Sequence, residues 1–244
     1  MKSLKACLFE FIGTFFLLFC GVGSIIINSQ TKNSIGNVGI SLAFGAVIAI
    51  MIYTCGHASG AQFNPAVTIA LSVFNKMDRK LAIPYIISQV LGAIAGSAVL
   101  KIIFGQQAQL GDTVPKITGN GPLITDSFVL EFIFTFLLMT VILNVAVRKS
   151  ADNNFAGLII GVVIFIGALI AGPVSGGSFN PARSIGPAIV NADYRYLWIY
   201  ILSPIIAAVF AGLVFEFTSE QEVSSLDDEL ADVDMPVHYK KEVV

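Results

Sequence analysis

The chain has 244 residues, of which 55% are hydrophobic and 12% are charged, and its formal net charge is −2 at pH 7. A soluble domain carries about 25% charged residues, and the apolar residues here form blocks of roughly 20, enough to cross a hydrocarbon layer of about 30 Å. These features exclude a soluble globular domain. They also exclude a transmembrane barrel, which would alternate polar and apolar residues over roughly 10-residue segments. They predict a helical integral membrane protein.

Six long apolar segments are predicted to span the membrane. Their approximate ranges are 5–28, 36–56, 81–104, 125–147, 155–172 and 197–217. The first segment follows Lys2 and Lys5 and therefore shares features with a secretory signal. Its length, the presence of Glu10 and the five later spans favour a transmembrane helix.

Two shorter apolar segments, about 64–74 and 180–190, each begin with Asn-Pro-Ala. At about 11 residues and 1.5 Å per residue, each is about 16 Å long, so only the two end to end would cross the membrane. Asn is a preferred N-cap and Pro suits the first helical position, so one such motif could be a helix cap and nothing more. Two copies in matched surroundings predict half-helices that meet near the midplane and line a passage. The six motif residues are Asn64, Pro65, Ala66, Asn180, Pro181 and Ala182.

The two halves of the chain resemble each other outside these motifs as well. FEFIGTFFLLF at 9–19 parallels LEFIFTFLLMT at 130–140, which matches Glu10 with Glu131. Each half has three spans, so the second must enter from the opposite side, as in an inverted repeat with its site at the interface. We predict one all-α channel domain, 1–217, with repeats at about 5–104 and 125–217.

The segments before the two motifs, 56–63 and 172–179, are rich in Gly and Ser and cannot be helical throughout. Irregular backbone at this depth survives only where it faces protein or a water-filled cavity.

Glu10 and Glu131 lie in separate halves. This favours a supporting role, in which each accepts hydrogen bonds from a re-entrant loop, over a paired catalytic or proton-relay role. His57 is expected in the first re-entrant loop near the cytoplasmic mouth, where a hydrogen-bonded loop side chain is favoured over the alternative of a gating pH sensor.

Arg183 follows Asn180 by three residues, on the first turn of the second half-helix. A charge within a membrane segment is rare and indicates function by default. One alternative is that Arg183 extends to the outer surface of the membrane. Beside a pore it would instead donate hydrogen bonds to a solute oxygen and repel cations.

No catalytic residue, cofactor or metal site is expected. The three cysteines have no metal-ligand spacing, and no nucleophile with an adjacent base is found in the spans. An enzyme is therefore excluded, and neither the composition nor any motif indicates a nucleic-acid partner.

The segment 218–244 contains eight acidic residues against two lysines and predicts a flexible cytoplasmic tail.

Positive charge in short loops predicts the orientation in the membrane. With the N-terminus inside, cytoplasmic segments carry seven Lys or Arg residues against four in external segments, which places both termini in the cytoplasm. The seven are Lys2, Lys5, Lys76, Arg79, Lys80, Arg148 and Lys149; the four are Lys32, Lys101, Lys116 and Arg195.

With these motifs, residues 5–217 resemble the major intrinsic protein family, which comprises aquaporins and aquaglyceroporins. The run AGPVSGGSFNPARSIGPAIV at 171–190 is most similar to plant nodulin-type members and their bacterial relatives. The resemblance implies six spans with two half-helices, a homotetramer in the plasma or inner membrane with one pore per subunit, and passive transport that excludes protons. In aquaporin-type pores an arginine and half-helix dipoles form the barrier to cations, and the resemblance assigns that arginine to Arg183.

The same resemblance places a selectivity filter at Phe44, Ala168, Gly177 and Arg183. Strict water channels usually have a histidine where this chain has Ala168, and glycerol facilitators usually have an aspartate where it has Ser184. Two small residues beside Phe44 and Arg183 imply a wide opening for water and small neutral solutes such as glycerol, urea or undissociated metalloid hydroxides. The alternatives are a strictly water-selective aquaporin, an ion-coupled inverted-repeat transporter and a scaffolding protein that has kept a channel fold.

Overall fold

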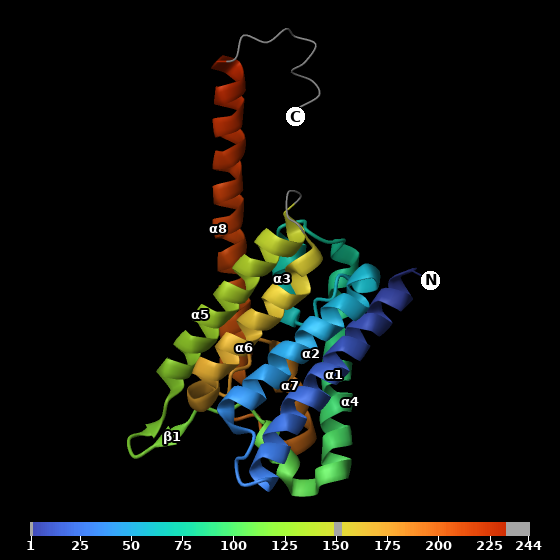
Figure 1. Cartoon of the computed structure of the whole chain (residues 1–244), viewed down its shortest axis with the longest axis vertical. Helices are drawn as coiled ribbons and strands as arrows, with labels where there is room; N and C mark the ends of the chain where they lie inside the picture. The colour runs from blue at the N-terminus through green and yellow to red at the C-terminus, as the bar shows by residue number, and fades with distance from the viewer. Residues whose placement is uncertain (1, 149–152, 233–244) are drawn as a thin grey trace.

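The structure is a computed structural model and describes residues 2–148 and 153–232 (Figure 1). Its long helices are α1 (Lys2–Gln30), α2 (Gly36–Ser59), α4 (Ala82–Phe104), α5 (Ile124–Ile142), α6 (Ala156–Ser175) and α8 (Leu197–Asp232). Two short helices, α3 (Pro65–Val73) and α7 (Pro181–Asn191), lie between them. Short 3-10 helices occupy Arg79–Leu81, Gly105–Gly111 and Asn153–Phe155, and a π-helical segment occupies Leu143–Val147. A small antiparallel hairpin, which the sequence does not predict, pairs β1 (Ile117–Thr118) with β2 (Gly121–Pro122).

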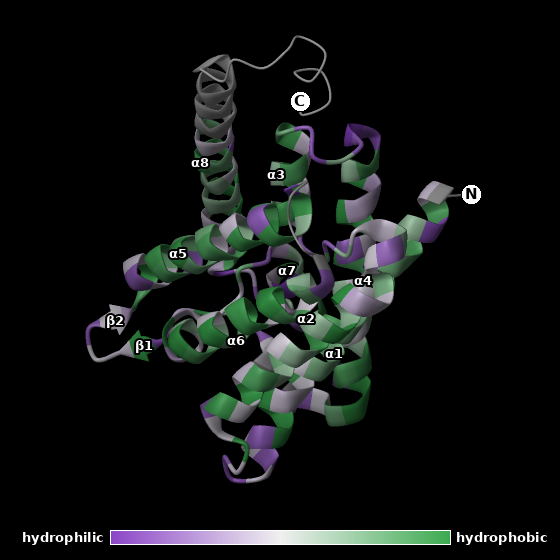
Figure 2. Cartoon of the chain, turned by 45° about the horizontal axis from the view of Figure 1, so that its top comes forward, coloured by the Kyte–Doolittle hydropathy of each residue, from purple (hydrophilic) through white to green (hydrophobic). Residues whose placement is uncertain are grey.

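In the described part of the chain, six helical segments are long and apolar enough to cross a membrane. Many of their large apolar side chains are exposed, which suits lipid contact and would be unusual for a soluble monomer. The hydropathy colouring shows these apolar residues along the helices and the hydrophilic residues mostly at their ends and near the centre (Figure 2). The predicted all-α fold with six spans and two half-helices is confirmed.

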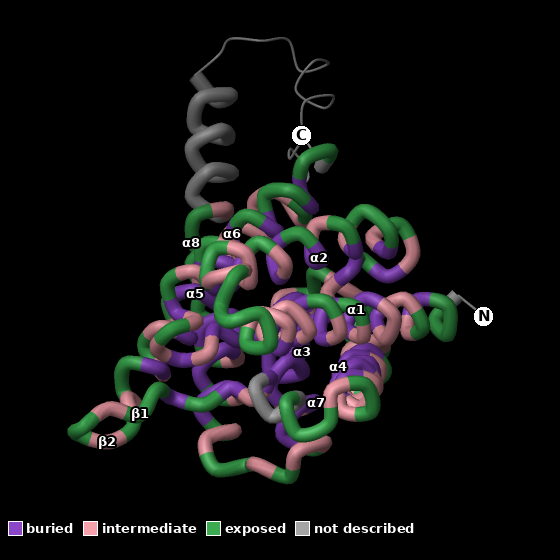
Figure 3. Tube along the Cα trace, turned by 60° about the horizontal axis from the view of Figure 1, so that its bottom comes forward, coloured by how far each residue is buried: buried purple, intermediate pink, exposed green. Residues whose placement is uncertain are grey.

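The two halves of the chain interlock through the half-helices. Helix α3 packs mainly against α8 and α7 mainly against α4, so each half-helix contacts the last span of the opposite half. Both short helices are largely buried at the centre of the bundle (Figure 3). Helices α2 and α6 cross closely at two glycines. A Cβ added at Gly45 would lie only 2.5 Å from the carbonyl oxygen of Gly161. This packing brings the two Asn-Pro-Ala motifs together.

The second and fifth spans end later than the sequence predicts. Helix α2 continues to Ser59 and α6 to Ser175, and each is capped by a left-handed glycine, Gly60 (φ 83°) and Gly176 (φ 87°). Glycine at this position ends a helix without the steric penalty that other residues incur. His57 therefore lies in the last turn of α2, and its placement in the re-entrant loop was wrong.

Helix α8 also extends beyond the predicted end of the last span. It continues to Asp232 and projects away from the bundle (Figure 1), so residues 218–232, expected to be flexible, are helical. After Gly212 the sequence contains no glycine or proline up to Asp232, and nothing in it signals a helix end. The remainder of the predicted tail, 233–244, lies outside the described residues, as does Lys149.

Candidate channel site

The two half-helices begin in the same way. Asn64 and Asn180 have extended backbones, and each side-chain oxygen accepts a hydrogen bond from the amide two residues later, Ala66 N at 2.9 Å and Ala182 N at 3.0 Å. A proline occupies the first helical position in both, where its missing N–H has no consequence. Both asparagines are therefore N-caps with a fixed side-chain orientation.

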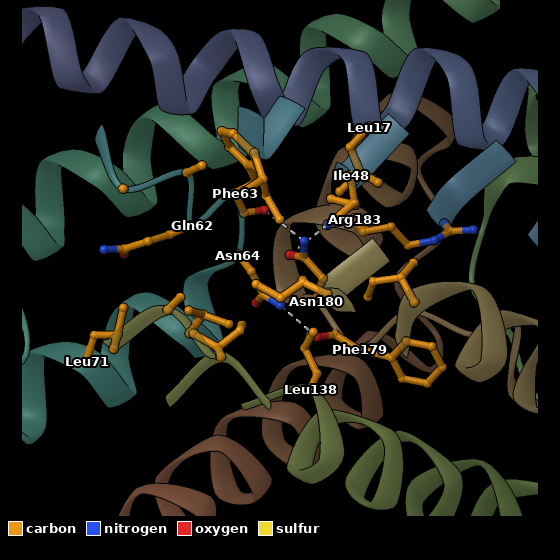
Figure 4. Close-up of a pocket in the computed structure, with 18 of the residues that line it drawn as sticks. Leu17, Ile48, Gln62, Phe63, Asn64, Leu71, Leu138, Phe179, Asn180 and Arg183 are labelled. Atoms are coloured by element: carbon orange, nitrogen blue, oxygen red, sulfur yellow. Dashed lines mark hydrogen bonds between the residues drawn. The ribbon is translucent and has the colours of Figure 1, made fainter. Parts of the chain in front are cut away.

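The caps are joined by a reciprocal pair of hydrogen bonds (Figure 4). Asn64 Nδ2 donates to the carbonyl oxygen of Phe179 at 2.8 Å, and Asn180 Nδ2 donates to that of Phe63 at 2.8 Å. The second N–H of each amide makes no hydrogen bond with the described residues, and both asparagines line the central cavity. The pair thus offers two donors to a molecule in that cavity.

Glu10 of α1 holds the first re-entrant loop. It is fully buried, and it accepts hydrogen bonds from Gln62 N at 3.0 Å, Phe63 N at 2.7 Å, Ser59 Oγ at 2.7 Å and Gln89 Nε2 at 2.8 Å. Phe63 has a φ of 52°, which is costly for a bulky residue, so its conformation needs such support.

Glu131 of α5 has the same position in the second half. It is fully buried and accepts from Ser178 N at 2.9 Å, Phe179 N at 2.6 Å and Ser175 Oγ at 2.8 Å. Phe179, like Phe63, is left-handed, with a φ of 54°. Neither glutamate lines the cavity. The contacts of both are with the loops that carry the motifs.

The central cavity has a volume of ≈ 390 Å³ and passes the asparagine pair. All four residues assigned to the selectivity filter, Phe44, Ala168, Gly177 and Arg183, line it. Its walls are otherwise mainly apolar, and none of the described lining residues is an aspartate or a glutamate. His57 is exposed, does not line the cavity, and contacts the ring of Phe9 at 5.6 Å between centroids.

Arg183 is 2% exposed and does not extend to the surface of the protein. Its Nη1 donates to the carbonyl oxygen of Gly111 at 2.6 Å, and its Cζ lies 5.4 Å from the centroid of the Phe44 ring, within cation–π range. Its Nε has no hydrogen-bond partner among the described residues. Gly111, which no sequence motif indicates, provides the hydrogen-bond acceptor for Arg183 through its backbone carbonyl.

Position 177 favours glycine for two reasons. Its φ is 56°, and a Cβ there would lie 3.3 Å from Gly172 N and 3.4 Å from Ala168 Cα. Gly177 and Ala168 therefore lie side by side, and both contribute little side-chain volume to the cavity.

A six-span bundle built as an inverted repeat, with two half-helices that meet at a central cavity, defines a class of integral membrane protein. A sequence model of the family described as "Major intrinsic protein" matches residues 1–215, and the chain belongs to this family. The resemblance drawn from the sequence motifs is confirmed.

Individual relatives agree with this assignment. The chain is 41% identical over 207 residues to Nodulin-26 of Glycine max, covering 84% of this chain and 74% of that protein. It is 41% identical over 215 residues to Aquaporin NIP1-2 of Arabidopsis thaliana, covering 87% and 73%. The structure of the aquaglyceroporin from Plasmodium falciparum matches with a TM-score of 0.77 and 26% identity, covering 87% of this chain and 95% of that chain.

Proposed function

We propose that the protein is a passive membrane channel for water and small uncharged solutes, namely glycerol, urea or undissociated metalloid hydroxides, and that it excludes protons and other ions. The observation that carries the proposal is the reciprocal pairing of Asn64 and Asn180 at the tips of two half-helices, inside a cavity of ≈ 390 Å³. The major intrinsic proteins are a family of channels, not of enzymes.

The asparagine pair explains how a channel can pass water without passing protons. An oxygen atom that accepts hydrogen bonds from both amides uses both of its lone pairs, so it has none left to accept a proton. Each half-helix also places roughly half a positive charge at its N-terminus, which opposes a cation at the same point. A neutral oxygen-containing solute gains hydrogen bonds there, whereas a cation gains none.

The residues assigned to the filter support a wide opening. Arg183 lines the cavity and carries a charge that repels cations. Ala168 and Gly177 leave space beside Phe44 and Arg183. The names of similar proteins include both aquaporin and aquaglyceroporin, which supports water and glycerol as solutes.

A transporter coupled to an ion would need a group that binds the ion in the passage. No carboxylate is found among the described residues that line the cavity, so the contacts there favour neutral solutes.

We also propose a homotetramer in the plasma or inner membrane with both termini in the cytoplasm. The family membership supports the tetramer, and the distribution of Lys and Arg in the loops supports the orientation.

Stopped-flow light scattering on proteoliposomes tests the solute range. For wild type, we expect fast fluxes of water, glycerol and urea. Ala168→His should lower glycerol permeability by about tenfold, which corresponds to a permeation barrier raised by roughly 1.4 kcal/mol. Water permeability should change by less than about twofold. Ala168→Ser serves as a control with little added volume. Fast water flux with background glycerol and urea permeability would instead identify a strict water channel, and an ionic current would contradict the proposal.

A further inference from the structure

The cavity continues past the asparagine pair on the side away from Arg183, where Gln62 lies (Figure 4). The described polar side chains at this end are mostly engaged. Ser59 donates to Glu10, and the Lys76 ammonium pairs with the Glu216 carboxylate at 2.8 Å. Gln62 is therefore the neutral polar side chain whose contacts decide what this end can bind.

A chain of hydrogen bonds fixes which way the Gln62 amide points. Glu10 receives four donors and acts as an acceptor, so Gln89 presents its Nε2 to Glu10 Oε2 at 2.8 Å. The same Nε2 donates to Thr68 Oγ1 at 2.9 Å. The single hydroxyl hydrogen of Thr68 goes to Gln62 Oε1 at 2.6 Å, the closer of its two acceptors, rather than to the Asn64 carbonyl oxygen at 3.1 Å. The amide oxygen of Gln62 thus faces Thr68 and its nitrogen is turned away from that network.

The nitrogen of Gln62 has only a weak partner. Its Nε2 lies 3.5 Å from the thioether sulfur of Met77, which also lines the cavity. A thioether is a weak acceptor and a methionine side chain is flexible, so an oxygen atom can readily take its place. Gly60 and Ala61 line the same wall, and their carbonyl oxygens accept no hydrogen bond from the described residues. Together these groups offer a solute one donor, Gln62 Nε2, and two acceptors, the carbonyl oxygens of Gly60 and Ala61.

The matching position in the second half, Ser178, provides no such donor. Thr113 Oγ1 donates to Ser184 Oγ at 2.7 Å, Ser184 and Ser178 are 2.6 Å apart, and Ser178 Oγ donates to the carbonyl oxygen of Asn180 at 2.8 Å. In this order every hydroxyl hydrogen is used within the protein. The Gln62 donor therefore belongs to one half of the channel.

We propose that Gln62, with the carbonyl groups of Gly60 and Ala61, forms a second binding position for a small polyol such as glycerol, separate from the constriction at Phe44 and Arg183. One solute oxygen accepts from Gln62 Nε2 in place of the Met77 sulfur, and the solute hydroxyls donate to the two carbonyls. Gln62 touches the solute, and Thr68 positions its amide. The inference rests on the proposed function, since the channel must admit such a solute.

Gln62→Met is the primary test, because it keeps the length of the side chain and removes the donor. Thr68 can then donate to the Asn64 carbonyl oxygen, already 3.1 Å away, so no hydroxyl is left unpaired. In proteoliposomes we expect glycerol permeability to fall by about five- to tenfold, the effect of one lost hydrogen bond, with water changed by less than about twofold. The same substitution at an exposed position, Gln30→Met, is the matched control and should change neither flux.

Thr68 gives a second readout. Thr68→Val frees the Gln62 amide to turn and should lower glycerol permeability by about threefold, and Thr68→Ser should restore it, because it keeps the hydroxyl. If Gln62→Met is not recovered as folded protein, Gln62→Asn, which withdraws the amide by one methylene, takes its place with the same expectation. An unchanged glycerol-to-water ratio in a conducting protein would overturn the binding position alone. Wild type that passes water but no glycerol would overturn the solute range as well.

Discussion

In both re-entrant units, residues 59–73 and 175–191, the loop before the half-helix is held by equivalent contacts. Tyr85 donates to the Ser59 carbonyl oxygen at 2.9 Å in the first unit, and Tyr200 donates to that of Ser175 at 2.6 Å in the second. Each unit also has a buried glutamate behind it and a left-handed phenylalanine before its asparagine. These shared residues fix the backbone, and their side chains act within the protein.

The units differ at positions that face the cavity. At the offset of 116 residues that relates Asn64 to Asn180, Val67 corresponds to Arg183 and Ala61 to Gly177. One side of the asparagine pair therefore carries the charge of Arg183, while the other carries the neutral amide of Gln62 and a lysine, Lys76, whose charge is paired with Glu216. A symmetric frame has acquired two different chemical environments, which a solute meets one after the other.

The shared part of the frame can be broken at the glutamates, and this should have the largest effect. Glu10→Ala removes an acceptor shared by four donors and Glu131→Ala one shared by three. Gln89 Nε2 keeps Thr68 Oγ1 and Ser175 Oγ keeps the Ala171 carbonyl oxygen, and each donor left unpaired costs about 1–3 kcal/mol. We expect neither variant to be recovered as a monodisperse species in detergent, as judged by size-exclusion chromatography. Glu216→Ala, which removes a partly exposed ion pair, should behave like wild type, because such pairs contribute about 1 kcal/mol or less. Wild-type behaviour of Glu131→Ala would show that the second re-entrant loop keeps its conformation without the glutamate.

The cationic half can be tested at its charge. Arg183→Met keeps an unbranched side chain and removes the barrier at one side, so we expect cation or proton leakage to rise by roughly tenfold, equivalent to about 1.4 kcal/mol of barrier. A trapped pH-sensitive dye in proteoliposomes measures the leak. Arg195→Met, at an exposed arginine paired with Asp193, is the matched control. If Arg183→Met leaks no more than this control, the half-helix tips alone exclude ions, and the difference in charge between the units serves another purpose.

The smallest expected effect concerns the pair Ala61 and Gly177, which are both left-handed, with φ of 50° and 56°. Gly177→Ala should cost about 1–2 kcal/mol of backbone strain and lower the melting temperature by a few degrees. The added methyl group also narrows the filter, so glycerol flux should fall more than water flux. The reciprocal change, Ala61→Gly, relieves the same strain and should not lower the melting temperature. Equal stability of Gly177→Ala and wild type would mean that the strain is absorbed locally.

Much of this fold is present in the sequence because its signals are local or repeated. Span lengths follow from hydropathy. The correspondence of Glu10 in the first repeat with Glu131 in the second follows from the matched segments around them. The end of α2 was missed because Gly60 was not interpreted as a helix C-cap, although glycine after a periodic segment is such a signal.

Other features leave no trace in residue identity. Gly111 contacts Arg183 through its backbone carbonyl, which every residue type possesses. The network from Glu10 to Gln62 depends on Gln89, a residue from another span whose approach is set by helix packing. The sequence therefore identifies the motifs, while the contacts that orient the motif side chains require three-dimensional information.

The crossed bonds between the two Asn-Pro-Ala segments also constrain biosynthesis. The acceptor for Asn64 lies 115 residues further along the chain, at Phe179. At a synthesis rate of about 5–20 residues per second, the ribosome needs roughly 6 to 23 s to add that acceptor. Until then the nascent N-terminal repeat holds an unmatched amide, so completion of the permeation path is a late, post-insertion event.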